Sequence, residues 1–419
     1  MSYTPFKSYF ALIDANNFYA SCERLFRPDL ITTPIIVLSN NDGCVIARSN
    51  EAKKMGIEMG VPFHQVKHLC HKHHIHVFSS NYALYGDLSN RLMHIIADNV
   101  PTMEIYSIDE AFVELQRQEI TLMHQLRGTI LQHIGVPVSI GIGPTKTLAK
   151  VANHIAKRVL YQPIFEINQE NIDWLKHIPI HDVWGVGRRW GQKLMALGIT
   201  TAHDLAHANS EFIRKHFNVV LTRIVRELNG INCLELDAPS NKKSIVSSKS
   251  FSKALHDYDS ISHALSHYCA RASEKLRAQG SKANFIHVFL KTNPFSKNSP
   301  QYRNACGYRL IMPSDDTREL VTHAKHCLKI IYRQGYRYHK TGVMLSDLQS
   351  KTIQQYSLLE TGKSQANPLM PLIDCINRRY GTSTIKVAAE GLHQTWRPLS
   401  LKRSPHYTTQ WQDLAKASC

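Results

Sequence analysis

The chain has 419 residues, of which 43% are hydrophobic, and its formal net charge is +17. This length and apolar content exclude a disordered chain and predict about three globular domains, while the positive charge favours nucleic acid over a membrane as the partner. No stretch reaches the ~18 apolar residues of a membrane span, and nine scattered cysteines without a Cys-x-x-Cys pair favour reduced thiols in a cytoplasm over a disulfide framework.

The first part of the chain mixes strand and helix signals. An apolar run predicts a buried strand over residues 9–14, and a helix is expected from Asn16 to Phe26. Later elements are expected as strands at 34–38 and 45–47, a helix at 50–55 capped by Ser49, paired strands at 103–107 and 111–115, a strand at 136–142 and a helix at 145–157. This mixture indicates an α+β domain around an antiparallel sheet over the first ~170 residues.

Three acidic residues lie where apolar strands end. Asp14 closes the first strand, and Asp109 and Glu110 lie at the tip of the predicted hairpin. Buried acids are costly unless their charge is compensated, and Mg²⁺ prefers carboxylates together with substrate phosphates. Three carboxylates on neighbouring strands are close to the minimum for a two-metal site, which points to phosphoryl or nucleotidyl transfer. The alternative is a helix cap at Asp14 and an ordinary turn at the acidic pair.

Lysines near these acids are candidates for binding a triphosphate. Lys53 lies one turn into a predicted helix, and Lys157 ends another. We expect that Lys146, Lys150 and Lys157 do not all share one helix face, so that not all of them reach the same anion. Taken singly, each lysine also fits a solvated helix surface.

Two aromatic residues follow Asp14 closely. Phe18 and Tyr19 come about one helical turn after it. A bulky ring there would lie under the sugar of a bound nucleotide and collide with a 2′-hydroxyl. Packing in the core is the alternative, and it weighs more for Phe18 than for Tyr19.

Residues 173–235 are predicted to be wholly helical. Gly185 and Gly187 fit a helix-hairpin-helix, in which glycines let backbone N–H groups approach a DNA phosphate. A packing turn between two helices is the alternative.

A polar linker over residues 236–245 precedes a basic segment. Residues 236–350 contain 18 Lys and Arg against 8 Asp and Glu, a net charge of +10. Helices near 259–279 and 314–334, with strands near 284–291, 305–311 and 341–345, fit a βαββαβ module. We expect this module to bind a nucleic acid backbone, with Lys249 and Lys253 among the contacts. A basic domain that is merely soluble and binds no nucleic acid is the alternative. Beyond this module, one more helix is expected near 367–380.

The histidine-rich tract from His68 to His76 matches no four-ligand zinc spacing. With 24 histidines in the chain, compositional bias explains the tract better, and whether it binds a metal stays open.

Four motifs together resemble the Y-family of translesion DNA polymerases. They lie at residues 13–23, 39–53, 106–112 and 141–150. The resemblance implies a right-hand α+β polymerase with an antiparallel-sheet palm, small fingers, a helical thumb and a βαββαβ little finger. The implied boundaries are 1–24 and 82–172 for the palm, 25–81 for the fingers, 173–235 for the thumb, 236–245 for the linker, 246–350 for the little finger and 351–419 for a partner-binding tail.

The resemblance also implies roles for single residues. The ligands of two Mg²⁺ ions fall on Asp14, Asp109 and Glu110 and on the carbonyl of Ala15. The steric gate against ribonucleotides falls on Tyr19, with Phe18 beside it at the nucleotide. Triphosphate contacts fall on Lys53 and Lys157. Many relatives carry tyrosine where Asn50 stands and arginine where Lys53 stands. At position 53 the compact ammonium charge of lysine therefore replaces the planar guanidinium group of arginine.

The implied function is error-prone, template-directed extension of a DNA primer with dNTPs in the bacterial response to DNA damage. Implied partners are primer-template DNA, a processed UmuD-like dimer, a RecA-like filament and the sliding clamp, with no membrane and a cytoplasmic location. Residues 355–359 look like a clamp-binding peptide, with Gln355, Leu358 and Leu359 as anchors.

Two other functions remain open at this point. Another palm-type nucleotidyl transferase, such as a cyclase, would share the acids. A DNA-binding scaffold whose carboxylates have lost their function would share the basic module. The basic segment argues against the cyclase, and the intact acids argue against the scaffold.

Overall fold

The chain forms two units in the computed structural model, which describes residues 8–238, 240–296, 298–353, 368–392, 394 and 396–414. Within these residues, the first unit contains 8–39, 43–238 and 402–414, and the second contains 40–42 and the described residues of 240–401. Among the described residues, no helix is both long enough and apolar enough to cross a membrane.

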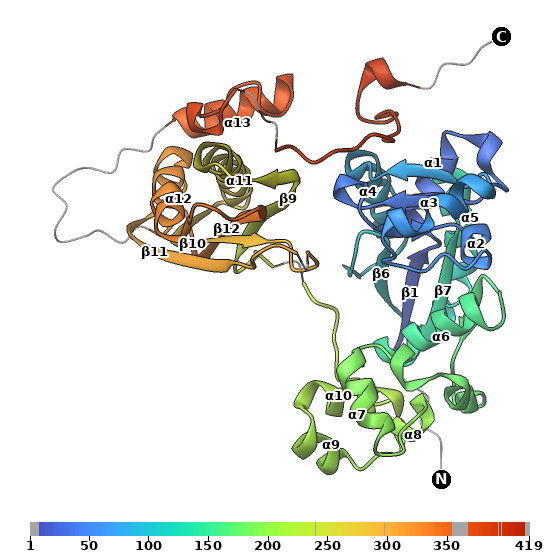
Figure 1. The fold of residues 1–419 in the computed structure, drawn as a ribbon. Helices are drawn as coiled ribbons and strands as arrows, with labels where there is room; N and C mark the ends of the chain where they lie inside the picture. Colours follow the sequence, from blue (N-terminus) through green and yellow to red (C-terminus); the bar gives the residue numbers. More distant parts are fainter. Residues whose placement is uncertain are drawn as a thin grey trace. The chain divides into compact units, whose positions relative to one another are not determined.

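A five-stranded sheet lies at the centre of the first unit (Figure 1). Its strands, in spatial order, are β5 (Met103–Ile105), β6 (Glu110–Leu115), β1 (Tyr9–Ala15), β7 (Val138–Gly143) and β8 (Ile164–Glu166). Strand β1 pairs antiparallel with β6 and β7, whereas β8 joins the edge parallel to β7. The expected antiparallel palm sheet is therefore confirmed, with one parallel strand at its edge.

Strand β1 is apolar from Tyr9 to Ile13 because both of its faces are covered there. Ala11 and Ile13 pack in a core that includes helices α4 (Tyr82–Asn99) and α5 (Leu122–Ile134). Phe10 and Leu12 face the other way and pack with Ala149 of helix α6 (Lys146–Arg158).

Helix α6 lies directly on β7. A Cβ atom at Gly141 would lie 2.1 Å from the backbone nitrogen of Asn153, so only glycine permits this approach. The Thr145 hydroxyl caps the helix by accepting from the N–H of Leu148. The close contact fixes α6, and with it Lys150 and Lys157, relative to the sheet.

A smaller sheet with mixed pairing adjoins this core. Its order is β3 (Val45–Arg48), β2 (Ile35–Leu38) and β4 (His76–Ser79), and β4 runs parallel to β2. Helices α1 (Phe18–Leu25), α2 (Asn50–Lys54) and α3 (Phe63–Lys72) accompany it. Ser49 caps α2, as expected.

Four short helices form the helical part of the first unit. They are α7 (Arg188–Met195), α8 (Ala202–Ala206), α9 (Ser210–His216) and α10 (Val219–Leu228). Their apolar faces share one core with α6. Short 3₁₀ helices elsewhere in the chain are Pro28–Leu30, Asn40–Asp42, Arg117–Glu119, Ile172–His177, Ile180–Asp182, Ala388–Glu390 and Trp411–Asp413.

The second unit has the expected βαββαβ order. Its elements are β9 (Ile245–Leu255), α11 (Tyr258–Ala278), β10 (Ser281–Thr292), β11 (Arg303–Ser314), α12 (Thr317–Ile331) and β12 (Tyr338–Ser350). The four strands are antiparallel in the order β11-β10-β12-β9, and both helices pack on one face. This module confirms the fold class.

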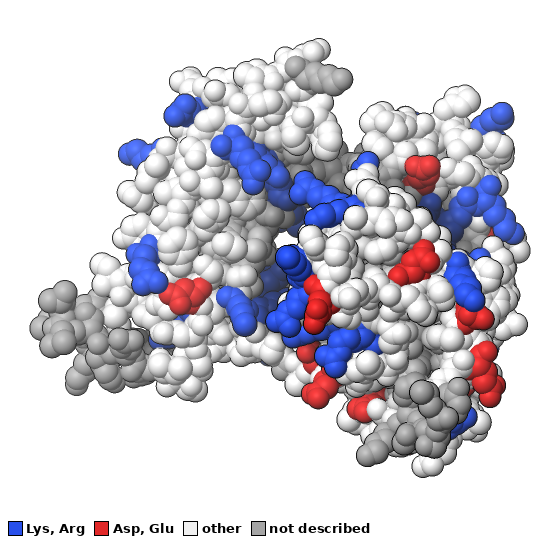
Figure 2. Space-filling view, turned by 90° about the horizontal axis from the view of Figure 1, so that it is seen from below, with Lys and Arg blue, Asp and Glu red and all other residues white. Residues whose placement is uncertain are grey.

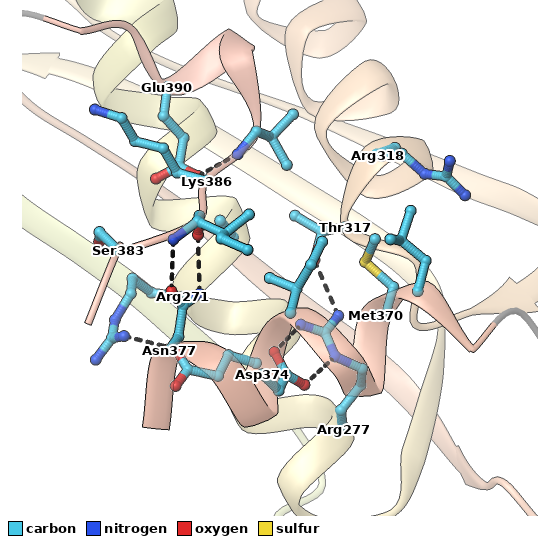
Figure 3. A pocket seen from close by; sticks show the side chains of 16 residues that line it. Arg271, Arg277, Thr317, Arg318, Met370, Asp374, Asn377, Ser383, Lys386 and Glu390 are labelled. Atoms are coloured by element: carbon cyan, nitrogen blue, oxygen red, sulfur yellow. Dashed lines mark hydrogen bonds and ion pairs between the residues drawn. The ribbon is translucent and has the colours of Figure 1, made fainter. Parts of the chain in front are cut away.

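Helix α13 (Leu369–Tyr380) packs against α11 through a buried ion pair. Arg277 of α11 donates from Nε and Nη2 to the Asp374 carboxylate of α13 at 2.6 and 2.8 Å, and its Nη1 donates to the Thr317 hydroxyl and the Asp315 carbonyl. Figure 3 shows Arg277 beside Asp374 and Thr317. A paired and fully bonded arginine fixes the helix in place. The helix predicted at 367–380 is therefore confirmed over its described residues.

Candidate active site

The pairing of β1 with β6 brings the three predicted acids to neighbouring positions. Asp14 lies directly opposite Glu110 in the antiparallel register. The backbone N–H of Ala15 donates to the carbonyl of Asp109 at 2.9 Å. Residues almost a hundred positions apart in the sequence therefore meet at one end of the sheet.

Burial shifts the pKa of Asp14 upward. Its loss of solvent raises the pKa from 3.8 to about 7, although the nearby Lys157 acts in the opposite direction. The charges of Glu110 and Asp109 raise the pKa further. Asp109 is oriented by the Ser107 hydroxyl, which donates to its Oδ1 at 2.6 Å. The site thus concentrates negative charge that favours a cation.

Helix α6 presents a row of lysines to a row of acids. Lys157 Nζ lies 2.5 Å from Asp14 Oδ1, Lys150 Nζ lies 3.1 Å from Glu110 Oε2, and Lys146 pairs with Glu104. The expectation that Lys146, Lys150 and Lys157 do not all share one helix face was wrong, whereas the expectation that not all of them reach the same anion is confirmed, because each pairs with a different acid. Seven residues turn a helix by about 700°, so Lys157 and Lys150 differ by only about 20°. Each lysine still meets a different acid, because the row follows the helix axis.

The donor chemistry of Asp14, Asp109 and Glu110 fits hard divalent cations, which prefer carboxylate oxygens. In the part of the chain that the structure describes, no group of three or more His, Cys, Asp or Glu side chains is already gathered around a metal position. Lysines neutralise two of the three carboxylates instead. The backbone therefore brings the three acids to one site, while lysine side chains of the protein itself pair with two of them.

A cleft of about 540 Å³ opens beside Asp14. Lys53, Lys157 and Arg158 line it, together with Asn17 and Arg127. Lys53 donates to Asn17 Oδ1 at 2.5 Å.

The lining of this cleft is strongly cationic. Burial lowers the pKa of Lys53, and so do the positive charges of Arg48, Arg158 and Lys157. Such a cluster favours a multivalent anion like a triphosphate. Sequence reasoning found Lys53 and Lys157 but missed Arg158, although it directly follows Lys157 in the chain.

The two aromatic residues after Asp14 have different surroundings. Phe18 is only 4% exposed and packs in the core, as its alternative interpretation predicted. Tyr19 is half-buried, and its ring stacks on Tyr85 with centroids 4.4 Å apart and an angle of 16°. Tyr82 meets the same ring edge-on. Tyr19 is therefore a partly exposed ring held in one orientation.

The predicted hairpin glycines serve different local needs. Gly185 has φ +82°, and a Cβ atom there would lie 2.4 Å from Cδ1 of Ile224 on α10. It therefore makes a packing turn. Gly187 precedes α7 at a position where a Cβ atom would meet open space, and the exposed Arg188 and Arg189 follow it. A phosphate contact at Gly187 and α7 stays a prediction.

Lys249 and Lys253 are exposed on β9 in the second unit. Partial loss of solvent around the Lys249 ammonium group and the charges of Arg271, Lys275 and Arg397 lower the pKa of Lys249, so several cations converge there. Lys and Arg side chains recur across the face that Figure 2 shows. This distribution fits a polyanionic partner, and the contacts themselves stay predictions.

The structure assigns no binding site to two further features of the sequence. The clamp-like residues Gln355, Leu358 and Leu359 lie outside the described residues. Most of the histidine-rich tract lies on α3 and the turn after it, largely exposed. Its metal binding stays open.

Comparison with family models identifies three regions. Residues 13–154 match the impB/mucB/samB family, and residues 242–358 match the C-terminal domain of that family. Residues 367–417 match a domain of unknown function, DUF4113.

Individual relatives align over almost the whole chain. The protein UmuC of Salmonella typhimurium strain LT2 is 46% identical, covering 97% of this chain and 99% of the relative. The protein ImpB of Salmonella typhimurium is 42% identical over the same shares. Among solved structures, a chimeric Y-family DNA polymerase built from Dbh and Dpo4 superposes with a TM-score of 0.67 at 18% identity, covering 82% of this chain and 99% of that one.

Proposed function

This chain belongs to the impB/mucB/samB family of Y-family translesion DNA polymerases, and from that premise we propose which of its residues perform the reaction. The family makes it an error-prone, DNA-directed DNA polymerase that depends on divalent metal. The proposal assigns two Mg²⁺ ions to Asp14, Asp109, Glu110 and the carbonyl of Ala15. The observation that carries it is the register that sets Asp14 opposite Glu110, beside the cationic cleft.

The bound ions would supply the charge that activates the primer 3′-hydroxyl and neutralises the leaving pyrophosphate. The chain's own residues orient and hold the reactants. Lys53, Lys157 and Arg158 bind the triphosphate in the cleft. Lys157 is paired with Asp14 in this structure, so it exchanges that carboxylate for a phosphate when dNTP arrives. Tyr19 closes the space below the sugar and excludes a 2′-hydroxyl.

The duplex is held by separate cationic parts of the chain. Gly187 and the start of α7 bind backbone phosphates at one place, and the cations around Lys249 and Lys253 bind them at another. The enzyme acts on bacterial DNA in the cytoplasm. A processed UmuD-like dimer, a RecA-like filament and the sliding clamp bring it to damaged sites, and the clamp contacts Gln355, Leu358 and Leu359.

Primer extension across a single abasic site tests this function. The purified chain is given Mg²⁺, dNTPs, a UmuD-like dimer and a RecA-like filament, with an undamaged template as the matched control. We expect extension past the abasic position, because the family tolerates templates that lack a base. Extension that stops before the lesion while the undamaged template is copied would contradict the proposal. Cyclic products formed from free nucleotides would favour the cyclase instead.

A further inference from the structure

The segment that matches a domain of unknown function begins in the second unit with α13, and its described end, residues 402–414, belongs to the first unit. We call residues 402–407 the C-terminal strap. Its backbone begins as an extension of the small sheet, because the Ser79 N–H donates to the Lys402 carbonyl at 3.0 Å. The Lys402 N–H donates back to the Ser79 hydroxyl at 2.9 Å. At its other end the Tyr407 ring stacks on Phe26 beside α1, with centroids 4.4 Å apart.

The centre of the strap is fastened to the beginning of α4. The Asn81 side chain caps this helix by accepting from the N–H of Leu84. Its amide nitrogen donates to the carbonyls of Ser404 and Pro405 at 3.1 Å each, and to the Ser404 hydroxyl at 3.0 Å. The residue that starts α4 is therefore also the one that holds the strap.

From this point a buried chain of contacts leads to the nucleotide side of α1. The Ser404 hydroxyl donates to Glu23 Oε1 at 3.1 Å. The Tyr85 hydroxyl donates to the same oxygen at 2.6 Å. The Tyr85 ring in turn stacks on Tyr19. Ser404, Glu23 and Tyr85 are 7%, 1% and 0% exposed, so water does not compete for these bonds.

We propose that the C-terminal strap sets the position of the Tyr19 ring, and hence the exclusion of ribonucleotides, through Ser404, Glu23 and Tyr85. The inference rests on the proposed role of Tyr19 as the steric gate. It gives the DUF4113 segment a part in sugar selection, in which Ser404, Glu23 and Tyr85 are positioning residues that never touch the nucleotide.

Two physical arguments support the coupling. Burying the Glu23 carboxyl raises its pKa to about 7, and its Oε2 is buried without a hydrogen-bond partner among the described residues. A costly group of this kind is retained where it orients its neighbours. In addition, a stacked ring transmits a small displacement directly to the ring beside it, since the interior is close-packed.

The test is the ratio of kcat/KM for a dNTP to kcat/KM for the matching rNTP, measured by primer extension with the proposed partners present. This ratio does not depend on the fraction of enzyme that folds. We expect Ser404→Ala and Tyr85→Phe each to lower it about fivefold to tenfold, the scale of one buried hydrogen bond. Glu23→Gln keeps the acceptor oxygen and should stay within about twofold of wild type, as should Thr409→Ala at an exposed position of the same segment.

The variant Tyr19→Ala separates this inference from the proposed function. If it collapses the ratio while Ser404→Ala and Tyr85→Phe match wild type, the strap has no part in selection and the inference is overturned alone. If Tyr19→Ala leaves the ratio unchanged, the gate assignment fails and the inference fails with it. Adding Ser404→Ala to Tyr19→Ala should cause no further loss, because the strap acts only through that ring.

Discussion

Primer extension by the Asp109→Asn variant should fall by at least about a thousandfold, while binding to primer-template DNA stays within about twofold of wild type. The substitution keeps the size of the side chain and leaves an oxygen that can accept from the Ser107 hydroxyl. It removes one negative charge from the shared site of Asp14, Asp109 and Glu110. The variant loses several kcal/mol of charge stabilisation in the transition state, and every ~1.4 kcal/mol lost lowers the rate tenfold.

A matched control is Asp98→Asn, which changes an exposed acid on α4 in the same unit. Its extension rate should equal that of wild type. Extension and DNA binding are measured on the same preparations, by single-turnover incorporation and by fluorescence anisotropy. Wild-type extension by Asp109→Asn would remove Asp109 from the catalytic centre.

The Tyr19→Ala variant should incorporate ribonucleotides at least about a hundredfold more readily relative to dNTPs, a change of about 2.7 kcal/mol. The Tyr19 ring is fixed by stacking on Tyr85, so it cannot move aside for a 2′-hydroxyl without losing that contact. Removing the ring opens the space below the sugar. The measurement is incorporation of rNTP and dNTP opposite the same template base.

Tyr19→Phe is the control for this variant. It keeps the ring and removes only the hydroxyl, so discrimination should remain within about threefold of wild type if exclusion is steric. A loss as large as that of Tyr19→Ala would instead assign selection to a hydrogen bond from the hydroxyl.

The sequence predicts the elements around the acids well because each carries a strong local signal. The apolar run of β1 ends at Asp14, and Thr145 begins a helix with clear apolar periodicity. No residue range was predicted for β9, the first strand of the expected βαββαβ module, because its sequence is rich in serine and lysine and buries only Ile245 and Phe251. Its place in the sheet comes from pairing with β12, which no local pattern reveals.

In the candidate site, too, local sequence signals identify the motifs but not the contacts between distant residues. Its motifs identify Asp14, Asp109 and Glu110, but pairing of Lys157 with Asp14 depends on how closely α6 approaches β7 at Gly141. The contact between Ser404 and Glu23 joins residues 381 positions apart, so sequence reasoning had no means of finding it. Local signals predict elements and motifs, whereas contacts distant in sequence are set by packing.

The most direct test of the account is the position of Mn²⁺ in crystals of the chain with primer-template DNA and a non-hydrolysable dNTP analogue, located by anomalous scattering. We predict two peaks about 3.5–4 Å apart, bound by oxygens of Asp14, Asp109 and Glu110, with Lys157 turned from Asp14 to the triphosphate. Peaks bound elsewhere, or an intact ion pair between Asp14 and Lys157 beneath the bound nucleotide, would contradict the account.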